Sequence, residues 1–226
     1  MLTGHGVRIA VIDSGVNASH PHVGRVAGGV AFDEHGAEHA DYTDRLGHGT
    51  AVTAAIVEKA PEAELFAIKV FDRALSTNVA ALIAGIDWAA NVGAHLINLS
   101  LGTSKQIHEE ALRQAVIRAA RHETLIVSAY FDGEVRWLPG SLPGVIPVAV
   151  DYALPRDRYR VVDAGGTKVF HASGFAREIP GVPPERNLHG ISLAVAHVTG
   201  FGARVAETLP TRAFDDVVAA LSRGGI

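Results

Sequence analysis

The 226-residue sequence contains no cysteine, which excludes disulfide bonds and thiolate metal sites. Aromatic residues make up only 6% of the chain, and its 20 basic residues are outnumbered by 24 acidic ones without any Lys/Arg block. A protein that binds nucleic acid usually has a basic patch or a set of aromatic side chains on which bases stack. Since the sequence has neither, no nucleic-acid partner is expected.

The longest apolar runs fall far short of the ~20 residues that a membrane-spanning helix needs, so we expect no membrane partner. Residues 1–6 contain no basic region, no long apolar region and no small-residue cleavage site. We therefore expect a cytoplasmic protein, or a mature fragment whose leader is missing. With 48% hydrophobic residues the chain is long enough for one substantial core, and a single domain is expected over residues 1–226.

Short apolar segments alternate with segments of helical periodicity along most of the chain, which predicts alternating strands and helices. A chain of this kind forms a parallel sheet with right-handed crossovers and helices on both faces. We therefore expect a three-layer, doubly wound α/β fold with a mostly parallel sheet. Strands are expected at residues 7–12, 26–32, 65–71, 96–102, 125–129 and 145–150, and helices at 51–59, 79–90, 104–121, 192–207 and 211–221.

Two single residues give further expectations about local structure. Ser104 is expected to cap the helix that follows it. Pro147 favours an edge position or a bulge for its strand, because proline lacks a backbone donor. An antiparallel hairpin is expected at residues 158–162 and 167–171, and loops at 130–144 and 174–188.

Asp13 ends the first apolar segment and is followed by Ser-Gly, which puts its carboxylate at the C-terminal end of a buried strand. Ligands and chemistry gather at this edge of open α/β sheets. His48 stands between two glycines at the start of the next helix, a position from which an imidazole projects into a cleft. Both residues also have a plain structural interpretation, since aspartate is common in glycine-containing turns and a lone histidine is usually just hydrogen-bonded.

The polar segment 17–43 contains several histidines and acidic residues, among them His35, His39 and Asp41. These three side chains have the chemistry of metal ligands. Acidic loops that carry histidine are, however, usually solvated without binding a metal. We expect no metal site there.

Ser192 follows a glycine and isoleucine and precedes small and apolar residues at helical spacing, so its hydroxyl stands at the start of a buried helix. Strand ends and helix starts share one edge of a doubly wound sheet, which permits Asp13, His48 and Ser192 to meet. In such a triad serine is the nucleophile, histidine is the general base and then the acid, and aspartate fixes the imidazole tautomer. The chain order Asp, His, Ser is that of subtilisin.

The motifs around these three residues resemble those of the subtilases, the subtilisin-like serine proteases. The resemblance extends over nearly the whole chain in the right order, although each motif alone is weak. The matching segments are residues 10–16, 47–52 and 190–198 for the aspartate, histidine and serine motifs, with further matches at 97–102, 138–140 and 145–148.

This resemblance implies a serine endopeptidase whose catalytic residues are Asp13, His48 and Ser192. It also implies that a peptide or protein substrate binds as an added strand in a cleft. No cofactor is implied, and the short segment 56–64 lacks the longer loop that binds calcium in many family members, so no calcium is expected there. The implied substrate-binding residues are Ser100, Leu101, Gly102, Ser128, Ala129 and Tyr130.

The sequence departs from the family pattern at the oxyanion position, where subtilases have Gly-Asn and this chain has Tyr130 and Phe131. Phenylalanine cannot donate a hydrogen bond. Loss of one such donor costs roughly 10² to 10³ in turnover, which attenuates catalysis without abolishing it. The backbone N–H of Ser192 remains as one donor, and Asn187 and His189 are candidates for the second. Tyr130 is also expected to crowd the wall of the primary specificity pocket.

Two functions of different classes therefore remain open. The first is a slow, narrowly specific serine endopeptidase, for example one that matures a dedicated precursor peptide. The alternative is a catalytically impaired, protease-like module that binds a peptide or partner protein without cleaving it. Retention of all three triad residues favours the enzyme, whereas Tyr130 and Phe131 favour the binding module.

Overall fold

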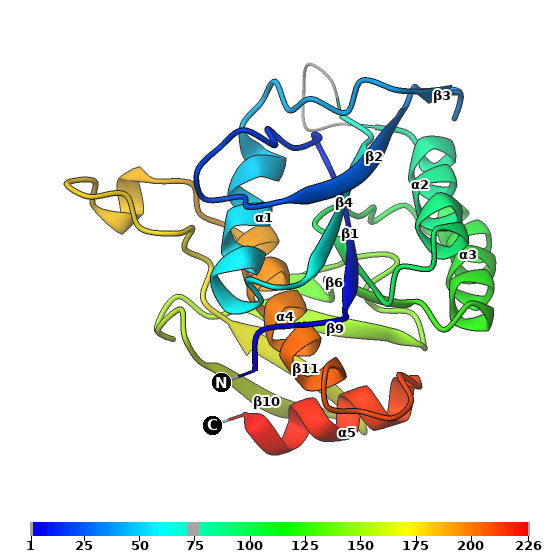
Figure 1. Cartoon of the computed structure of the whole chain (residues 1–226). Helices are drawn as coiled ribbons and strands as arrows, with labels where there is room; N and C mark the ends of the chain where they lie inside the picture. Colours follow the sequence, from blue (N-terminus) through cyan, green and yellow to red (C-terminus); the bar gives the residue numbers. More distant parts are fainter. Residues whose placement is uncertain (1, 72–76, 226) are drawn as a thin grey trace.

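The computed structural model describes residues 2–71 and 77–225 and shows the expected three-layer α/β architecture (Figure 1). In these residues nine strands form one sheet in the order β10-β11-β9-β6-β5-β1-β4-β2-β3. All neighbours from β11 to β2 are parallel, and β10 and β3 add antiparallel edges. The strands are β1 (Arg8–Asp13), β2 (Val26–Phe32), β3 (Glu38–His39), β4 (Glu64–Lys69), β5 (Leu96–Leu99), β6 (Leu125–Ala129), β9 (Val145–Val150), β10 (Tyr159–Ala164) and β11 (Thr167–Ala172).

Strand β1 illustrates why the sheet is buried on both faces. Ile9 and Val11 belong to one hydrophobic core, and Ala10 and Ile12 belong to another. Because successive side chains of a strand point to opposite faces, a continuous apolar run needs a helix layer on each side. Helices α1 (His48–Lys59), α4 (Ile191–Ala206) and α5 (Phe214–Gly224) cover the first face, and α2 (Val79–Asn91) and α3 (Glu109–Arg121) cover the second.

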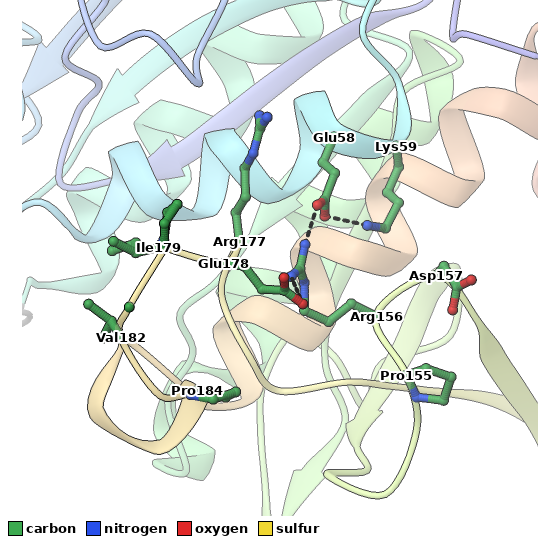
Figure 2. Close-up of a pocket in the computed structure, with 12 residues that line it drawn as sticks. Glu58, Lys59, Pro155, Arg156, Asp157, Arg177, Glu178, Ile179, Val182 and Pro184 are labelled. Atoms are coloured by element: carbon green, nitrogen blue, oxygen red, sulfur yellow. Dashed lines mark hydrogen bonds and ion pairs between the residues drawn. The ribbon is translucent and has the colours of Figure 1, made fainter.

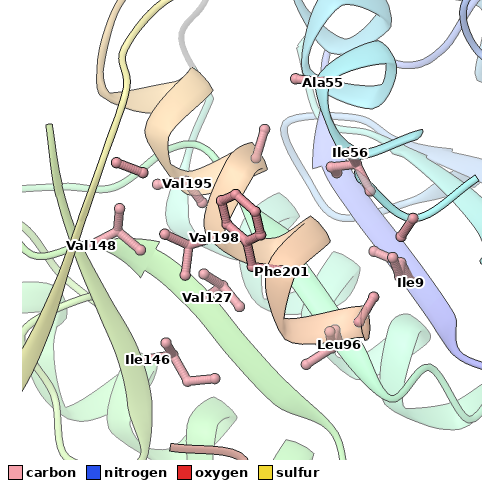
Figure 3. Packing of buried hydrophobic residues seen from close by; sticks show 14 of the residues in the cluster. Ile9, Ala55, Ile56, Leu96, Val127, Ile146, Val148, Val195, Val198 and Phe201 are labelled. Atoms are coloured by element: carbon pink, nitrogen blue, oxygen red, sulfur yellow. The ribbon is translucent and has the colours of Figure 1, made fainter. Parts of the chain in front are cut away.

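Helix α4 is buried along most of its length and forms the centre of the first core (Figure 3). Its Val195, Val198 and Phe201 lie between α1 and the strands that carry Val127 and Ile146. Each such side chain contributes about 1.5–3 kcal/mol when it is fully buried. This packing holds the N-terminus of α4, and with it Ser192, against the carboxyl edge of the sheet.

The prediction that Pro147 marks an edge strand is wrong, because β9 lies inside the sheet between β6 and β11. The carbonyl of Val148 accepts a hydrogen bond from Tyr130 on the β6 side. In a parallel sheet the backbone groups of successive residues point to the strands on opposite sides. Because Val148 points to β6, the nitrogen of Pro147 points to β11. Registered pairs with β11 begin only at Val148, and therefore no ladder bond is lost.

Three other boundaries differ from the predictions. Ser104 does not cap a helix, because a 3-10 turn at Gln106–His108 comes first and α3 begins after it without a side-chain cap. The strand expected at 96–102 ends at Leu99. The loop expected at 130–144 contains a separate two-stranded hairpin, β7 (Phe131–Asp132) and β8 (Val135–Arg136), and a 3-10 turn at Pro184–Arg186 lies in the loop 174–188.

The structure confirms the expected strand at 26–32, the expected hairpin, which is formed by β10 and β11, and the five expected helices. Their boundaries differ from the predicted ones by a few residues. No helix in residues 2–71 and 77–225 combines the length and apolar character required to cross a bilayer.

A close approach of α1 and α4 generates the first testable prediction. A Cβ atom on Gly200 would lie 2.7 Å from the Cβ of Lys59, whereas one on Gly202 would lie 3.5 Å from the nearest side chain. We expect Gly200→Ala to lower the free energy of unfolding by about 1–3 kcal/mol through overpacking. The matched control Gly202→Ala should raise it by up to about 1 kcal/mol, since alanine favours helices. Chemical denaturation measures both, and equal effects would contradict the packing described here.

Candidate active site

The centre of the candidate site is a hydrogen bond between Asp13, the last residue of β1, and His48, the first residue of α1. The distance from His48 Nδ1 to Asp13 Oδ1 is 2.7 Å. Asp13 is fully buried, and the His48 side chain is 15% exposed. With Nδ1 donating its proton to the carboxylate, Nε2 is left unprotonated, which is the tautomer of a general base.

Backbone packing brings these two elements together. A Cβ atom on Gly49 would lie 2.1 Å from the carbonyl oxygen of Gly15, so the first turn of α1 touches the turn after β1 directly. Gly15 itself has a φ of 93°, in the left-handed region that favours glycine. Gly49 therefore permits a contact between α1 and the turn after β1 that any side chain would block.

Asp44 joins the same two elements, although the sequence analysis did not single it out. Its Oδ1 accepts hydrogen bonds from Ser14 Oγ and from the backbone N–H groups of Leu46 and Gly47, each at 2.9 Å. Its Oδ2 accepts from the backbone N–H of Thr50 at 2.9 Å and from Thr50 Oγ1 at 2.6 Å. Asp44 thus replaces the missing side-chain cap of α1 and ties that helix to the turn after Asp13.

Burial disfavours a charged imidazole at His48, but the hydrogen bond and negative charge of Asp13, together with the charge of Asp44, outweigh it. The pKa of His48 is consequently raised above its ordinary value. The pKa of Asp44 is lowered, because its hydrogen bonds from Thr50 and from Leu46 and Gly47 outweigh the effect of burial. The site therefore holds two carboxylates that favour a proton on His48.

Ser192 lies in the first turn of α4, and its Oγ donates a hydrogen bond to the carbonyl of Ser100 at 3.2 Å. Ser100 directly follows β5, which pairs with β1 through Leu99 and Ile12. Asp13 and Ser100 directly follow this pair, each on its own chain segment, and neighbouring strands of a sheet lie about 4.8 Å apart. The structure therefore brings Ser192, through Ser100, to the same edge of the sheet as the Asp13–His48 pair, and no hydrogen bond joins Ser192 to His48 within the described residues.

The expected substrate-binding segments differ in accessibility. Leu101 and Gly102 are half-buried, and in the part of the chain that the structure describes their backbone groups form no hydrogen bond, which leaves an edge that an added strand can use. Ser128 and Ala129, in contrast, are 0% and 5% exposed inside β6. The latter two residues offer little surface to a peptide, and Tyr130 at the end of β6 is the accessible one.

At the oxyanion position, Phe131 begins β7, and its ring contacts Tyr130 and His171 with ring centres 5.4 and 6.3 Å apart. The amide Nδ2 of Asn187 donates to the carbonyl of Arg177 at 3.0 Å. Asn187 is therefore engaged within its own loop, and its candidacy as a second oxyanion donor stays a prediction. His189 donates through Nδ1 to the carbonyl of Asn187 at 3.0 Å, and a role for its Nε2 stays a prediction.

Tyr130 lines a cavity of about 390 Å³ together with Gly140 and Pro147. The guanidinium carbon of Arg136 lies over the Tyr130 ring, 5.4 Å from the ring centre. That cavity does not include Leu101 or Gly102. Crowding of the primary specificity pocket by Tyr130 stays a prediction.

The histidine-rich loop does not gather three metal ligands. His39 Nε2 lies 3.3 Å from Asp33, and Asp41 pairs with Arg45 at 2.6 Å. Across residues 2–71 and 77–225, no three His, Cys, Asp or Glu side chains form a group that could hold a metal ion.

A second cavity, of about 760 Å³, lies at the other end of α1 (Figure 2). There the Glu58 carboxylate bonds to both Lys59 and Arg156, and Arg156 also pairs with Glu178 at 3.3 Å. Burial opposes ionisation of Glu58, but the hydrogen bonds of Arg156 and Lys59 lower its pKa to about 2. Helix α1 separates this cluster from His48 by roughly 16 Å. Its charges balance one another, which is typical of a structural ion cluster.

Comparisons with known proteins identify the family. The subtilase family matches residues 4–146, which contain Asp13, His48 and Phe131. The chain is 34% identical to the thermostable alkaline protease of Halalkalibacterium halodurans, over 93% of this chain and 59% of that protein. It is 32% identical to subtilisin Savinase of Lederbergia lenta, over 93% of this chain and 80% of that protein.

Among solved structures, a cold adapted subtilisin-like serine proteinase shares the fold with a TM-score of 0.75, over 98% of this chain and 83% of that chain at 22% identity. The fold and the site thus define a subtilisin-like α/β protein. The chain belongs to the subtilase family. It spans less than two thirds of the length of the Halalkalibacterium protease.

The position of Asp44 yields a prediction about the charge state of the site. Asp44→Asn removes a negative charge near His48, so the protonated imidazole loses stabilisation and the pKa of His48 should fall. NMR titration of the His48 imidazole measures this, with the resonance assigned from a His48→Ala variant. Asp41→Asn is the matched control, because Asp41 lies on the same loop but is exposed. An unchanged His48 pKa in Asp44→Asn would contradict the electrostatic role of Asp44.

Proposed function

We propose that the chain is a serine endopeptidase that hydrolyses peptide bonds through Ser192, His48 and Asp13. The observation that carries the proposal is the buried 2.7 Å hydrogen bond of His48 to Asp13, at the sheet edge where Ser192 meets Ser100. A structural role alone does not require a fully buried carboxylate to be paired with a partly accessible imidazole beside a helix-terminal serine. The proteolytic names of the relatives support the same function.

The mechanism begins with rotation of Ser192 Oγ from the Ser100 carbonyl toward His48 Nε2. His48 accepts the hydroxyl proton while Oγ attacks the carbonyl carbon of the substrate, and Asp13 stabilises the imidazolium that forms. The same proton then passes to the leaving amine, which breaks the peptide bond and leaves an acyl ester on Ser192. Water then attacks the ester with His48 again as the base, the bond to Ser192 Oγ breaks, and Oγ takes back the proton from His48, so that the second product is an acid and the serine is restored.

We further propose that turnover is slow and specificity narrow, as suits the maturation of a dedicated precursor peptide. Phe131 offers no donor to the oxyanion, and one missing donor costs roughly 10² to 10³ in turnover. In addition, the Ser192 hydroxyl must leave its hydrogen bond to Ser100 before it reacts. A cytoplasmic location stays a prediction.

One specific observation favours the alternative, a module that binds a peptide without cleaving it. The Ser192 hydroxyl is bonded to Ser100 and not to His48, and Leu101 and Gly102 leave a free edge for strand addition. Binding along this edge needs no chemistry.

Covalent labelling with a fluorophosphonate distinguishes the two functions. Such probes react with serines that are activated by a base, so the endopeptidase is expected to gain one phosphonyl group on Ser192, detected by mass spectrometry of the intact protein and its peptides. Ser192→Ala and His48→Ala should abolish the labelling, whereas Ser222→Ala, on α5, should leave it unchanged. A folded protein that stays unlabelled would overturn the proposed activity and support the binding module.

A further inference from the structure

A fully buried amide lies in the core that contains α4. Asn98 on β5 is 0% exposed, and its register partners on the two neighbouring strands are Val11 and Val127. Both valines belong to that core, as does Leu96, which lies two residues earlier on the same face of β5. A buried amide is costly unless its polar atoms are hydrogen-bonded, so an apolar side chain would suit this position. Asn98 therefore calls for a role that packing does not supply.

Hydrogen bonds connect Asn98 to α4 on one side and to the end of β5 on the other. The hydroxyl of Thr199, which is also fully buried, shares its proton between Asn98 Oδ1 and the carbonyl of Val195, each at 2.9 Å. Asn98 Nδ2 donates to the hydroxyl of Ser100 at 2.7 Å. The amide thus bridges the helix that carries the nucleophile and the strand end that the nucleophile contacts.

Ser100 faces Ser192 with both its backbone and its side chain. Its carbonyl accepts the hydrogen bond from Ser192 Oγ at 3.2 Å, and its hydroxyl lies 3.5 Å from the carbonyl oxygen of Ser192. The hydroxyl that Asn98 orients is therefore the one that approaches the backbone of the nucleophile. Ser192 and Thr199 are seven residues apart, so they lie two turns apart on nearly the same face of α4.

Helix α4 consequently meets the β5 segment at two polar points that are about 10 Å apart along the helix axis. Apolar packing is non-directional, whereas a hydrogen bond depends on distance and angle. Two such points on one face therefore define how the helix is rotated and how far it extends toward the sheet edge. This precision matters for catalysis, because misplacement of a reacting group by about 1 Å can slow a reaction about 10²-fold.

We propose that Asn98 and Thr199 are positioning residues that hold Ser192 in the register from which its hydroxyl attacks. This inference rests on the proposed endopeptidase function and deepens it. Both residues are fully buried, so neither contacts a bound peptide, and they act through Ser100 and through α4. Because both side chains are neutral, they leave the charge of the Asp13–His48 pair unaltered.

Kinetics of fluorophosphonate labelling of Ser192 in the full chain test this role. Thr199→Val keeps the shape of the side chain but removes its hydroxyl, and we expect the limiting rate at saturating probe to fall about 10-fold. Asn98→Leu removes both links and should lower that rate about 10²-fold. Because neither residue touches the probe, the probe concentration that gives half the limiting rate should change by less than about twofold.

Thr124→Val is the matched control. Thr124 is also buried, and its hydroxyl also donates to a carbonyl, that of Ala94 at 2.6 Å, but it precedes β6 at the opposite edge of the sheet. Its labelling rate should stay within about twofold of that of the unaltered protein. Thr199→Ser, which keeps the hydroxyl, should react within about threefold of the unaltered rate.

Two further readouts separate positioning from a loss of folded protein. Each variant should carry one label per chain at completion, measured by intact mass, because every folded molecule keeps the site. The double variant Asn98→Leu/Thr199→Val should react within about twofold of Asn98→Leu alone, since the two residues act along one path. If Asn98→Leu does not fold, the comparison of Thr199→Val with Thr199→Ser and Thr124→Val decides.

The outcomes overturn different claims. If Ser192 of the unaltered protein takes no label, the endopeptidase function fails, and the inference fails with it. If Ser192 is labelled but Thr199→Val reacts as fast as Thr124→Val, the endopeptidase function stands and the positioning role is overturned. A Thr199→Ser protein as slow as Thr199→Val would also overturn that role, because the hydroxyl would then not be the group that matters.

Discussion

The hydrogen bond between Asp13 and His48 is the interaction on which the rest of the site depends. A carboxylate that is fully buried at the end of a strand is costly unless it is paired, and the imidazole supplies that pairing. The contact in turn requires that α1 begin directly on the turn after β1, which Gly49 permits and Asp44 reinforces. Catalytic geometry and local stability are thus properties of the same few contacts.

The two ends of α1 perform different tasks. Its N-terminus carries His48 and is held by Asp44, whereas its C-terminus is held by the ion cluster of Glu58, Lys59 and Arg156. Between them the helix packs closely on α4, which brings the nucleophile. Two helices packed together on one face of the sheet, α1 and α4, therefore set the distance between His48 and Ser192.

Much of this arrangement was predictable from sequence because its signals are local. Continuous apolar runs gave the strands, and the residues at the strand end and the two helix starts gave Asp13, His48 and Ser192. The absence of the asparagine that stabilises the oxyanion in the family was equally predictable, because residue 131 is phenylalanine. These features depend on residue types at one or a few neighbouring positions, and the structure shifted only the ends of the elements that carry them.

Other features depend on contacts between distant segments, and sequence reasoning missed them. Pro147 tolerates an interior strand because β11 pairs only beyond it. The side chain of Asn187 turns into its own loop, which no sequence pattern announces. For Asp44 a signal existed, since an aspartate shortly before a helix start is a capping candidate.

The central claim is that Ser192 forms an acyl-enzyme with His48 as its base, and rapid quenching after addition of an activated ester tests it most directly. Peptide mass spectrometry of a p-nitrophenyl ester reaction should detect an acyl group on Ser192 that accumulates faster than free acid. It should be absent in His48→Ala. Ester hydrolysis without an acyl group on Ser192, or equal acylation in the folded His48→Ala protein, would contradict the claim.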